Sequence, residues 1–450
     1  MSSMYSATRL PVETGRSGWE AICQRTFPVR SLDGHQNADW LIVGAGFAGL
    51  TAARRLTQVR PGEKVVVLDA KEIAEGPAGR NSGYMIDVPH NLSAGEYSAA
   101  GADATALEIA QNRFAIAYAK EAAAEYGMDR DTFDPSGKIN AAATERGLGF
   151  NERYAASLSR IGEVNTLLDA KAMRELTGSD YYLGGLQTPG AVLIQPAEYI
   201  RAFAAGLQSR VSLFENSPVT ALERQGGVWT ARTPGGSVSA PKVILAVNGH
   251  IQDFGHFKGR LMHVFTYASM TAGFDPADFG RNASGARRWA LLPADPMGAT
   301  VRKITDRQGK DRIVVRTRFT YDPSMLVSDA RVAGIAAEQR KSFVARFPAL
   351  AAVPMAYSWA GRLCLTRNNV PVFGEIDEGL YSACVENGLG TVKSTLAGVL
   401  AVDLAVGLPS QTLSSYMNQP APKRIPPEPF AWLGINSVIR WQELRAGREA

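Results

Sequence analysis

Cysteine is scarce in this chain, with three residues, Cys23, Cys364 and Cys384, among 450. They form no CxxC pair and no spacing typical of metal ligands, so we expect no metal site. A chain of this length can bury a sizeable core without a disulfide framework. Three scattered cysteines therefore favour a reducing compartment.

Long apolar runs are also missing. Residues 1–18 contain no apolar core of the kind that secretory signals have. The longest apolar stretch near the end, 396–408, contains Asp403 and is too short to span a bilayer. Net charge is +5, but Lys and Arg are scattered, which argues against a nucleic-acid partner. We therefore expect a cytoplasmic protein with no membrane span and no nucleic-acid partner.

What the chain does contain is a complete dinucleotide-binding pattern in residues 39–71. A short apolar run, Trp40–Val43, is typical of a buried parallel strand and leads into the turn GAGFAG at 44–49. A helical stretch follows over 50–59, and a second apolar strand, 64–68, ends at Asp69. The strand, the glycines, the helix, the second strand and the acid occur in the expected order, which makes this much stronger than a lone GxGxxG.

Each glycine of this turn has a physical role. Gly44 permits the tight turn, Gly46 lets the backbone approach a pyrophosphate, and Gly49 lets helix and strand pack closely. The helix N-terminus presents free N–H groups to the phosphates. Asp69 is placed to accept hydrogen bonds from ribose hydroxyls. The unit by itself is compatible with either NAD or FAD.

The rest of the chain alternates between two kinds of segment. Buried strands are expected near 40–70, 211–214, 243–249 and 380–385, and alternating strands and helices fill the intervals. We predict an α/β (α+β two-domain) fold, in which a Rossmann-like cofactor domain is assembled from discontinuous segments and an antiparallel-sheet substrate domain is inserted. The predicted ranges are 1–37 for an N-terminal extension, 38–100, 190–260 and 355–410 for the cofactor domain, 101–189 and 261–354 for the substrate domain, and 411–450 for a Pro-rich tail with a terminal helix.

A second glycine-rich turn follows the strand at 381–385. Residues 386–391, ENGLGT, precede a helix, whose N-terminus would direct N–H groups at an electron-rich atom. An ordinary strand–helix turn explains the local sequence equally well.

Motifs in a fixed order along the chain resemble those of a known family. They are GAGFAGLTAA (44–53), GRNSG (79–83), LAVNG (245–249), WAGRLCLTRNNVPVFG (359–374) and NGLGTVKSTLAG (387–398). This combination resembles the FAD-dependent amine oxidoreductases of the D-amino-acid oxidase, glycine oxidase and sarcosine oxidase superfamily. It looks most like the γ-glutamylputrescine oxidase-like branch, over roughly residues 38–432. The resemblance implies FAD rather than NAD.

The resemblance also implies a set of cofactor residues. It assigns the pyrophosphate to Gly44, Gly46, Phe47, Ala48 and Gly49, the adenosine ribose to Asp69, Ala70 and Lys71, and the adenine side to Val219. The stretch toward the flavin is assigned to Arg80, Asn81, Ser82, Gly83 and Met85. Asn248 and Gly249 are assigned to the edge of the strand at 243–249, and the pyrimidine edge of the flavin is assigned to Gly388, Leu389, Gly390 and Thr391.

Two departures from the family concern the substrate. Where glycine oxidase-like members carry an Arg for the substrate carboxylate, this chain has Leu363, and the neighbouring Arg362 is expected to face the opposite side of an extended strand. Where amino-acid oxidases carry a second Arg, this chain has Glu386. A cationic amine, such as a polyamine derivative or an opine-like N-substituted amino acid, is therefore expected. A D-amino acid or N-methyl amino acid is the alternative, and Glu386 pairing elsewhere is an equally good interpretation.

Relatives that attach the flavin covalently give a further expectation. Members with a His link carry it where this chain has Arg80 and Asn81, and Cys364 does not fall where the sarcosine oxidases place their linking Cys. We predict non-covalent FAD.

The expected reaction is transfer of a hydride from the carbon beside an amine nitrogen to the flavin, followed by imine hydrolysis. Candidates for catalysis and substrate binding come from the loop after GRNSG, from the second glycine turn and from the presumed antiparallel sheet. The catalytic candidates are Glu386, His90, Tyr84 and Lys303, and the substrate-binding candidates are Tyr267, Arg316, Arg318 and Asp87. Arg316 and Arg318 are expected to share one face and to bind a remote carboxylate.

Three questions remain open at the level of sequence. The electron acceptor is O2 or a quinone, and the oligomeric state is undefined. An alternative of another class is the FAD-bearing subunit of a multi-component complex that is inactive alone. A hydroxy-acid dehydrogenase on the same scaffold is a third option.

Overall fold

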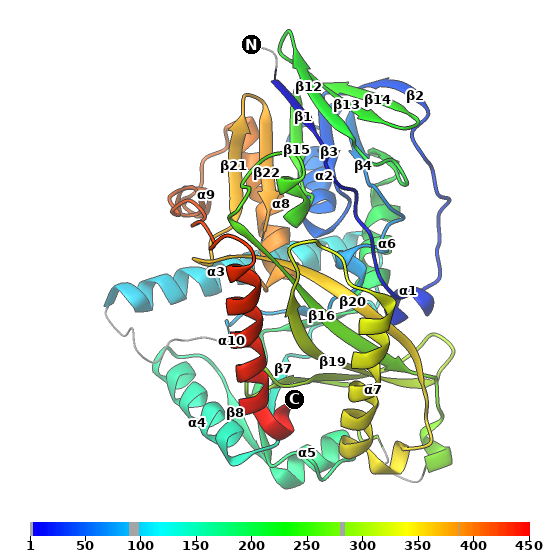
Figure 1. Cartoon of the computed structure of the whole chain (residues 1–450), viewed down its shortest axis with the longest axis vertical. Coiled ribbons are helices and arrows are strands. Elements are labelled where there is room, and N and C mark those ends of the chain that lie inside the picture. The colour runs from blue at the N-terminus through cyan, green and yellow to red at the C-terminus, as the bar shows by residue number, and fades with distance from the viewer. Residues whose placement is uncertain (1–2, 90–98, 280–283, 386) are drawn as a thin grey trace.

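A six-stranded sheet forms the upper part of the molecule (Figure 1). The computed structural model describes residues 3–89, 99–279, 284–385 and 387–450, with only the backbone for 99–104. The strand order is β11-β4-β3-β15-β22-β21. All neighbours run parallel except β21 against β22. The strands are β3 (Trp40–Val43), β4 (Val65–Leu68), β11 (Ser212–Phe214), β15 (Lys242–Leu245), β21 (Val372–Asp377) and β22 (Leu380–Cys384).

Both faces of this sheet are covered, which explains why its central strands are apolar at every position. One face packs against helices, and the other packs against a five-stranded sheet of order β1-β12-β13-β14-β2. The helices are α2 (Phe47–Val59), α3 (Ala99–Glu125), α6 (Pro196–Leu207) and α8 (Gly390–Val406), and the strands are β1 (Ser3–Ser6), β2 (Gly34–Asn37), β12 (Ala221–Gln225), β13 (Val228–Thr233) and β14 (Gly236–Ala240). A tight turn at Gly226 and Gly227 joins β12 to β13 as a hairpin.

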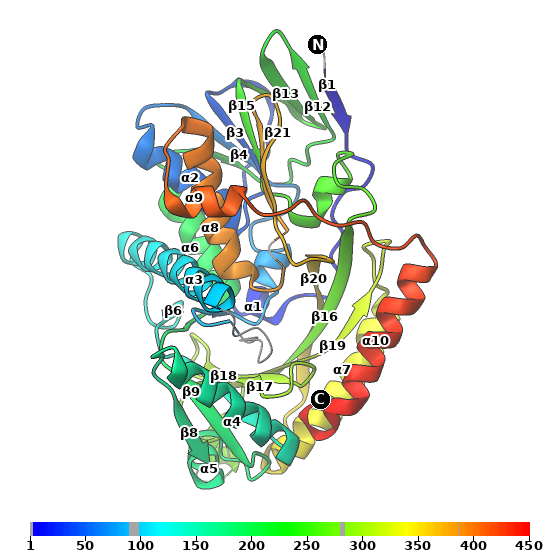
Figure 2. The ribbon, with the colours of Figure 1, turned by 90° about the vertical axis from the view of Figure 1, so that its left-hand side faces the viewer.

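An eight-stranded, mostly antiparallel sheet fills the lower part, in the order β20-β16-β19-β18-β17-β7-β9-β8 (Figure 2). Its strands are β7 (Lys138–Ala142), β8 (Thr166–Asp169), β9 (Gly184–Thr188), β16 (Leu261–Thr271), β17 (Trp289–Pro293), β18 (Thr300–Thr305), β19 (Asp311–Tyr321) and β20 (Met355–Thr366). The parallel sheet from scattered segments and the separate antiparallel sheet confirm the predicted fold class.

Helices pack on both faces of the eight-stranded sheet. Those that pack on it are α4 (Glu145–Arg160), α5 (Ala170–Thr177), α7 (Asp329–Arg346) and α10 (Phe430–Ala446). The remaining elements are α1 (Gly18–Ala21), α9 (Gln411–Met417), the 3-10 turns η1 (Pro77–Gly79), η2 (Asn248–Gln252), η3 (Pro276–Phe279), η4 (Pro348–Leu350) and η5 (Gly447–Glu449), and a small sheet of β5 (Tyr84–Met85), β10 (Val192–Ile194) and β6 (Phe133–Asp134). Helix α3, which lies in the range predicted for the substrate domain, packs on α6 and α8 instead.

Residues 1–37 were expected as an extension, but their described part is integrated into the fold. β1 pairs with β12 and β2 pairs with β14, so both ends of the segment add to the five-stranded sheet. Between them the chain runs from β1 at the top of Figure 1 down to α1 beside the lower sheet. Trp19 of α1 is fully buried, and its carbonyl accepts a hydrogen bond from Gln195 Nε2 at 2.9 Å.

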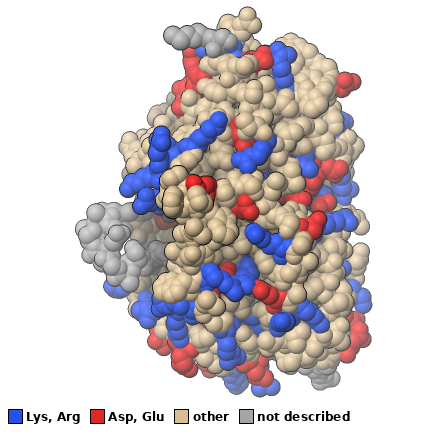
Figure 3. Space-filling view, viewed as in Figure 1, with Lys and Arg blue, Asp and Glu red and all other residues tan. Residues whose placement is uncertain are grey.

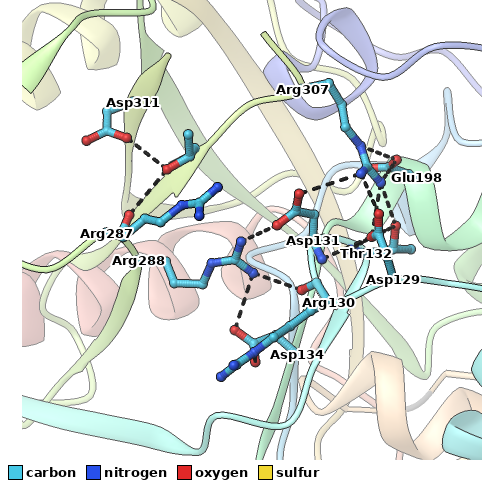
Figure 4. A network of polar contacts seen from close by, with 11 residues as sticks. Asp129, Arg130, Asp131, Thr132, Asp134, Glu198, Arg287, Arg288, Arg307 and Asp311 are labelled. Atoms are coloured by element: carbon cyan, nitrogen blue, oxygen red, sulfur yellow. Dashed lines mark hydrogen bonds and ion pairs between the residues drawn. The ribbon is translucent and has the colours of Figure 1, made fainter. Parts of the chain in front are cut away.

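A cluster of ion pairs ties the loop at 129–134 to two other parts of the molecule (Figure 4). Arg307, in the turn between β18 and β19, lies 2.5 Å from both Asp129 and Glu198 of α6. Arg288 pairs with Asp131 and lies 3.6 Å from Asp134. The network links α6, which packs behind the parallel sheet, to the antiparallel sheet.

Within the described ranges no single helix has the length and apolarity needed to cross a membrane. The pair α8 and α9, bent by 97°, meets that requirement only when its two helices are taken together.

Candidate functional site

The turn between β3 and α2 closes tightly around its glycines. Gly44 has φ +104°, and a Cβ there would lie 2.4 Å from the carbonyl oxygen of Ala246. A Cβ on Gly49 would lie 1.8 Å from the Gly44 carbonyl oxygen, so helix and turn pack without room for a side chain. Gly46 begins α2 with no side-chain cap, which leaves the first N–H groups of the helix open to a ligand.

Asp69 lies at the carboxyl end of β4, next to this turn. Its carboxylate accepts hydrogen bonds from the N–H of Ala45 at 2.7 Å and of Lys71 at 2.9 Å. Burial raises its pKa from 3.8 to about 6, against the lowering effect of these two N–H groups. The carboxylate is therefore fixed in place at the edge where parallel sheets bind ligands.

A cavity of about 660 Å³ extends from this turn to the antiparallel sheet. Most of the residues assigned to the cofactor from sequence line it. They are Gly44, Gly46, Phe47, Ala48, Asp69, Ala70, Lys71, Arg80, Asn81, Ser82, Gly83, Val219, Asn248, Gly249, Gly388, Leu389, Gly390 and Thr391. Gly49 lies behind the turn rather than at the cavity, and the Met85 side chain is buried in the core beneath the helices.

The loop after β4 is held by local and distant contacts. Asn81 bridges its own turn, because its side chain bonds the Ala78 carbonyl at 2.7 Å and the Gly83 N–H at 2.8 Å. Arg80 is buried and donates to the carbonyls of Thr14 and Ala360 at 3.2 and 3.1 Å. These contacts place Ser82 and Gly83 along the cavity wall.

The N-terminal segment supplies a wall of the cavity that the sequence reasoning missed. Arg9, Leu10, Pro11 and Glu13 all line it. The Glu13 side chain is 3% exposed and lies 3.1 Å from Arg362 and 3.7 Å from Arg80. Desolvation raises the pKa of Glu13, while the two arginines act in the opposite direction. No motif marks this segment, because its glutamate is brought to the cavity only by the folding of β1 and α1.

Helix α8 begins at the opposite side of the cavity. Its N-cap residue, Leu389, offers no side-chain cap, and Gly388 has φ +89°. Thr391 Oγ1 donates a hydrogen bond to the Tyr84 carbonyl, which ties this helix to the loop after GRNSG. Two helix N-termini without side-chain caps therefore face one cavity, and each favours negative charge.

The end of the cavity near the antiparallel sheet combines apolar side chains with two unsatisfied polar groups. Its lining includes Ile86, Met262, Leu292, Phe319 and Leu363. The buried Tyr84 hydroxyl and the buried Nη1 of Arg316 have no hydrogen-bond partner among the described residues. Burial raises the pKa of Tyr84 and lowers that of Arg316 to about 10, so the phenol is neutral and the guanidinium charged at neutral pH.

Arg316 and Arg318 do not share a face, contrary to the expectation from strand alternation. The pairing of β16 with β19 shifts register at Thr266 and Tyr267, and Arg318 occupies the bulge with φ +65°. Arg318 is turned away and pairs with Glu338 at 2.7 Å and Glu443 at 2.6 Å. Only Arg316 of the two lines the cavity.

Three other candidates also lie away from the cavity. Tyr267 packs beneath α7 and bonds Thr320 at 2.6 Å, whereas its neighbour Thr266 lines the cavity. Lys303 is buried in an ion pair with Asp311 at 2.7 Å. Asp87 is buried and lies 3.2 Å from Arg113. The alternation of strands and these tight ion pairs explain why none of the three reaches the cofactor cavity.

Two candidates, His90 and Glu386, lie outside the described residues. One histidine that sequence reasoning missed does line the cavity: His250 of η2, whose Nδ1 is 2.7 Å from Asp253 Oδ2. Burial lowers the pKa of His250, so it is neutral at neutral pH. The feature of the sequence that could have identified His250 is its position directly after the Asn-Gly pair that follows β15.

The cavity suits FAD by its chemistry. It offers a glycine turn with a bare helix N-terminus for a pyrophosphate and a fixed carboxylate for a ribose. At its far side a second bare helix N-terminus lies near an apolar chamber. An elongated dinucleotide needs these groups in this order.

Comparison with known proteins agrees with this site. A family model described as FAD dependent oxidoreductase (DAO) matches residues 39–404. The chain is 26% identical to the probable oxidoreductase OrdL of Haemophilus influenzae over 385 residues, which is 83% of this chain and 84% of that protein. It is 26% identical to the gamma-glutamylputrescine oxidoreductase of Escherichia coli over 408 residues, covering 90% of this chain and 92% of that protein.

A solved structure shows the same fold. Glycine oxidase from Geobacillus kaustophilus superposes with a TM-score of 0.68 and 19% identity, over 85% of this chain and 98% of that chain. The family model covers well over half of the sequence, so the resemblance inferred from the motifs is confirmed. The chain belongs to the DAO family of FAD-dependent oxidoreductases, and FAD is its cofactor.

Proposed function

We propose that this enzyme oxidises an amine that also carries a carboxylate, and that Arg316 binds the carboxylate. The observation that carries the proposal is the buried Arg316 Nη1, which has no partner in the part of the chain that the structure describes. An uncompensated buried charge is costly, so its retention at a cavity wall points to an anionic ligand. The Tyr84 hydroxyl, also without a described partner, offers a second hydrogen bond.

The position of this cation favours a remote carboxylate over that of a simple α-amino acid. Leu363, at the place of the family's substrate arginine, packs among apolar side chains instead. Arg362 is paired with Glu13 and so is already neutralised. The gamma-glutamylputrescine named for the Escherichia coli relative carries both a carboxylate and a distant amine, so it has the chemistry proposed here.

The side chains of the cavity would orient the substrate and keep its amine reactive. Bound FAD supplies the oxidising power by accepting a hydride from the carbon beside the nitrogen. The amine must first lose its proton, and the apolar chamber around Leu292 and Phe319 favours the neutral form by desolvation. Glu386 stays a predicted partner of the incoming ammonium. The electron acceptor is O2 or a quinone. Comparison of turnover in air with anaerobic turnover in the presence of an added quinone distinguishes the two.

Anaerobic bleaching of the flavin tests the substrate class. We expect carboxylated amines, including γ-glutamylpolyamines and opines, to bleach it, and free D-amino acids to do so poorly. Arg316→Met should raise KM for the carboxylated amines about 10- to 100-fold, because a charge-assisted hydrogen bond is lost. The same variant should change KM little for putrescine, which has no carboxylate.

The surface variant Arg232→Met serves as the matched control, since Arg232 is an exposed arginine of β13 paired with Glu223. Bleaching by free D-amino acids alone would contradict the proposed substrate class. If the KM of Arg316→Met were unchanged for every carboxylated amine, Arg316 would not be the residue that binds the carboxylate.

A further inference from the structure

The C-terminal helix α10 exposes an unusual amount of apolar surface. Large apolar side chains that point to solvent along its 17 residues are Phe430, Trp432, Leu433, Val438, Trp441 and Leu444. Phe430 and Leu444, near its two ends, are 69% and 68% exposed. Scattered exposed apolar residues are ordinary, but four of these six, all except Trp432 and Val438, share one side of the helix and form a contiguous patch.

The patch forms a stripe on the outer side of the helix. At helical spacing Phe430, Leu433, Trp441 and Leu444 fall on one side. The inner side carries Ala431, which is buried against β16 and β19, with Ile435 and Ile439 packed on the same cluster. The inner side already has its partner in the fold, whereas the outer apolar side has none among the described residues.

The charges beside the stripe are basic. Arg440 and Arg445 are exposed and lie on opposite flanks of the stripe, and Arg448 follows directly after the helix. The one acidic residue of α10, Glu443, is buried and lies 2.6 Å from Arg318 and 3.3 Å from Arg440. Arg445 and Arg448 have no acidic partner among the described residues, so they carry the unpaired positive charge at this border. Figure 3 draws the face of the molecule that includes α10, where uncharged surface lies between groups of Lys and Arg and groups of Asp and Glu. The occupant of the stripe should therefore be apolar at its centre and anionic at its border.

We propose that the outer face of α10 binds the surface of an anionic lipid bilayer. An amphipathic helix with Trp, Phe and Leu on one side and arginines beside them is typical of a helix that lies in the interface. Helix α10 is about 25 Å long and has charged flanks, so it lies on the bilayer and does not cross it. It forms an outer edge of the molecule in Figure 2, where a flat surface has access to it.

A second copy of the chain fits the stripe less well. Antiparallel pairing of two α10 helices would bring Arg440 and Arg445 toward the same arginines of the copy, with Glu443 buried and already paired. Such a contact would bury like charges together. Anionic head groups neutralise these arginines, which a second copy of the chain cannot do.

Vesicle binding of the intact holoenzyme tests this inference without reference to substrate. We expect the protein to sediment with vesicles of phosphatidylcholine containing about 30 mol% phosphatidylglycerol, but only weakly with phosphatidylcholine alone. High salt should weaken the binding, because the arginines are screened. Leu444→Glu should lower the partition coefficient roughly tenfold or more, since an apolar contact is lost and a negative charge is introduced.

Val164→Glu is the matched control, because Val164 is an equally exposed apolar residue, at 68%, that lies away from α10. It should bind vesicles like the unmodified protein, whereas Arg440→Glu with Arg445→Glu should lose the preference for phosphatidylglycerol. Absence of binding to the anionic vesicles overturns the proposal, and so does equal binding by Leu444→Glu. A dimer in light scattering that Leu444→Glu converts to a monomer, without vesicle binding, would assign the stripe to a second copy instead.

Discussion

Asp69 links cofactor binding to pH through a single side chain. Burial raises its pKa to about 6, and ribose hydroxyls donate stronger hydrogen bonds to its deprotonated form, which is the better acceptor. The dissociation constant for FAD should therefore rise as the pH falls below about 6, by up to about tenfold per pH unit. Titration of the apoprotein with FAD between pH 5 and pH 8 measures this directly.

The stability of the apoprotein should move in the opposite direction. The folded pKa of Asp69 lies above the ordinary value of 3.8, so the folded state binds the proton more tightly than the unfolded state. The contribution to the free energy of unfolding is full below pH 3.8 and is lost as the pH rises to about 6. Asp69→Asn should abolish both dependences, and a persistent pH dependence of FAD binding in that variant would assign it to another group.

The two buried cysteines near the cavity bear on how the flavin is held. Cys364 and Cys384 both line the cavity wall, and desolvation raises the pKa of Cys364 well above its usual range. A buried neutral thiol is a poor nucleophile. We therefore predict that acid precipitation of the holoenzyme leaves a colourless pellet and a yellow supernatant. A yellow pellet that withstands washing would contradict non-covalent FAD.

At the scale of elements, the N-terminal segment acts as part of the site because of Glu13. This carboxylate lies between two buried arginines that line the cavity, Arg80 and Arg362. Glu13→Gln removes the negative charge that both arginines face. The free energy of unfolding should therefore fall by about 3–5 kcal/mol, because buried charges are left unpaired. Urea unfolding measures the change, and FAD content reports whether the cavity wall is preserved.

An exposed ion pair provides the comparison for Glu13. Asp180 is 75% exposed and pairs with Arg174, which is 67% exposed, so Asp180→Asn should cost no more than about 1 kcal/mol. Equal unfolding midpoints for the two variants would show that the buried pairing at the cavity contributes little.

The strand β19 shows how a β-bulge can interrupt the alternation of side chains that the sequence predicts. Alternation placed Arg316 and Arg318 on one face, and it holds along the strand up to the bulge. One extra residue at Arg318 turns it outward to Glu338 and Glu443. A bulge depends on the pairing with β16, which is distant in sequence, so the local pattern carries no sign of it.

At the scale of the whole molecule, the isolated chain holds both parts of the site. The glycine turn of the cofactor site and the apolar chamber proposed for the substrate line one cavity within a single chain. We therefore expect purified protein to reduce an artificial dye with a carboxylated amine at a steady rate. The measurement is dye reduction combined with size-exclusion chromatography. A requirement for an added protein component would favour the alternative of an FAD-bearing subunit.

The sequence alone determined the nucleotide end of this protein. The apolar strands at 40–43 and 65–68, the glycines between them and Asp69 are contiguous, so hydrophobic pattern and glycine stereochemistry are sufficient to place them. The motifs that follow identified the family and the cofactor for the same reason. Each of them is a short local segment that can be read without knowledge of distant contacts.

Tertiary structure alone decided the composition of the cavity near the antiparallel sheet and the outer surface of α10. Glu13, Thr266 and Arg316 come from separate strands and loops, and strand register determines which of their neighbours reach the cavity. The two apolar sides of α10 are indistinguishable in sequence until the fold buries one of them against β16 and β19. Long-range pairing sets both outcomes, because it fixes which face of each element is covered and which remains open to a ligand.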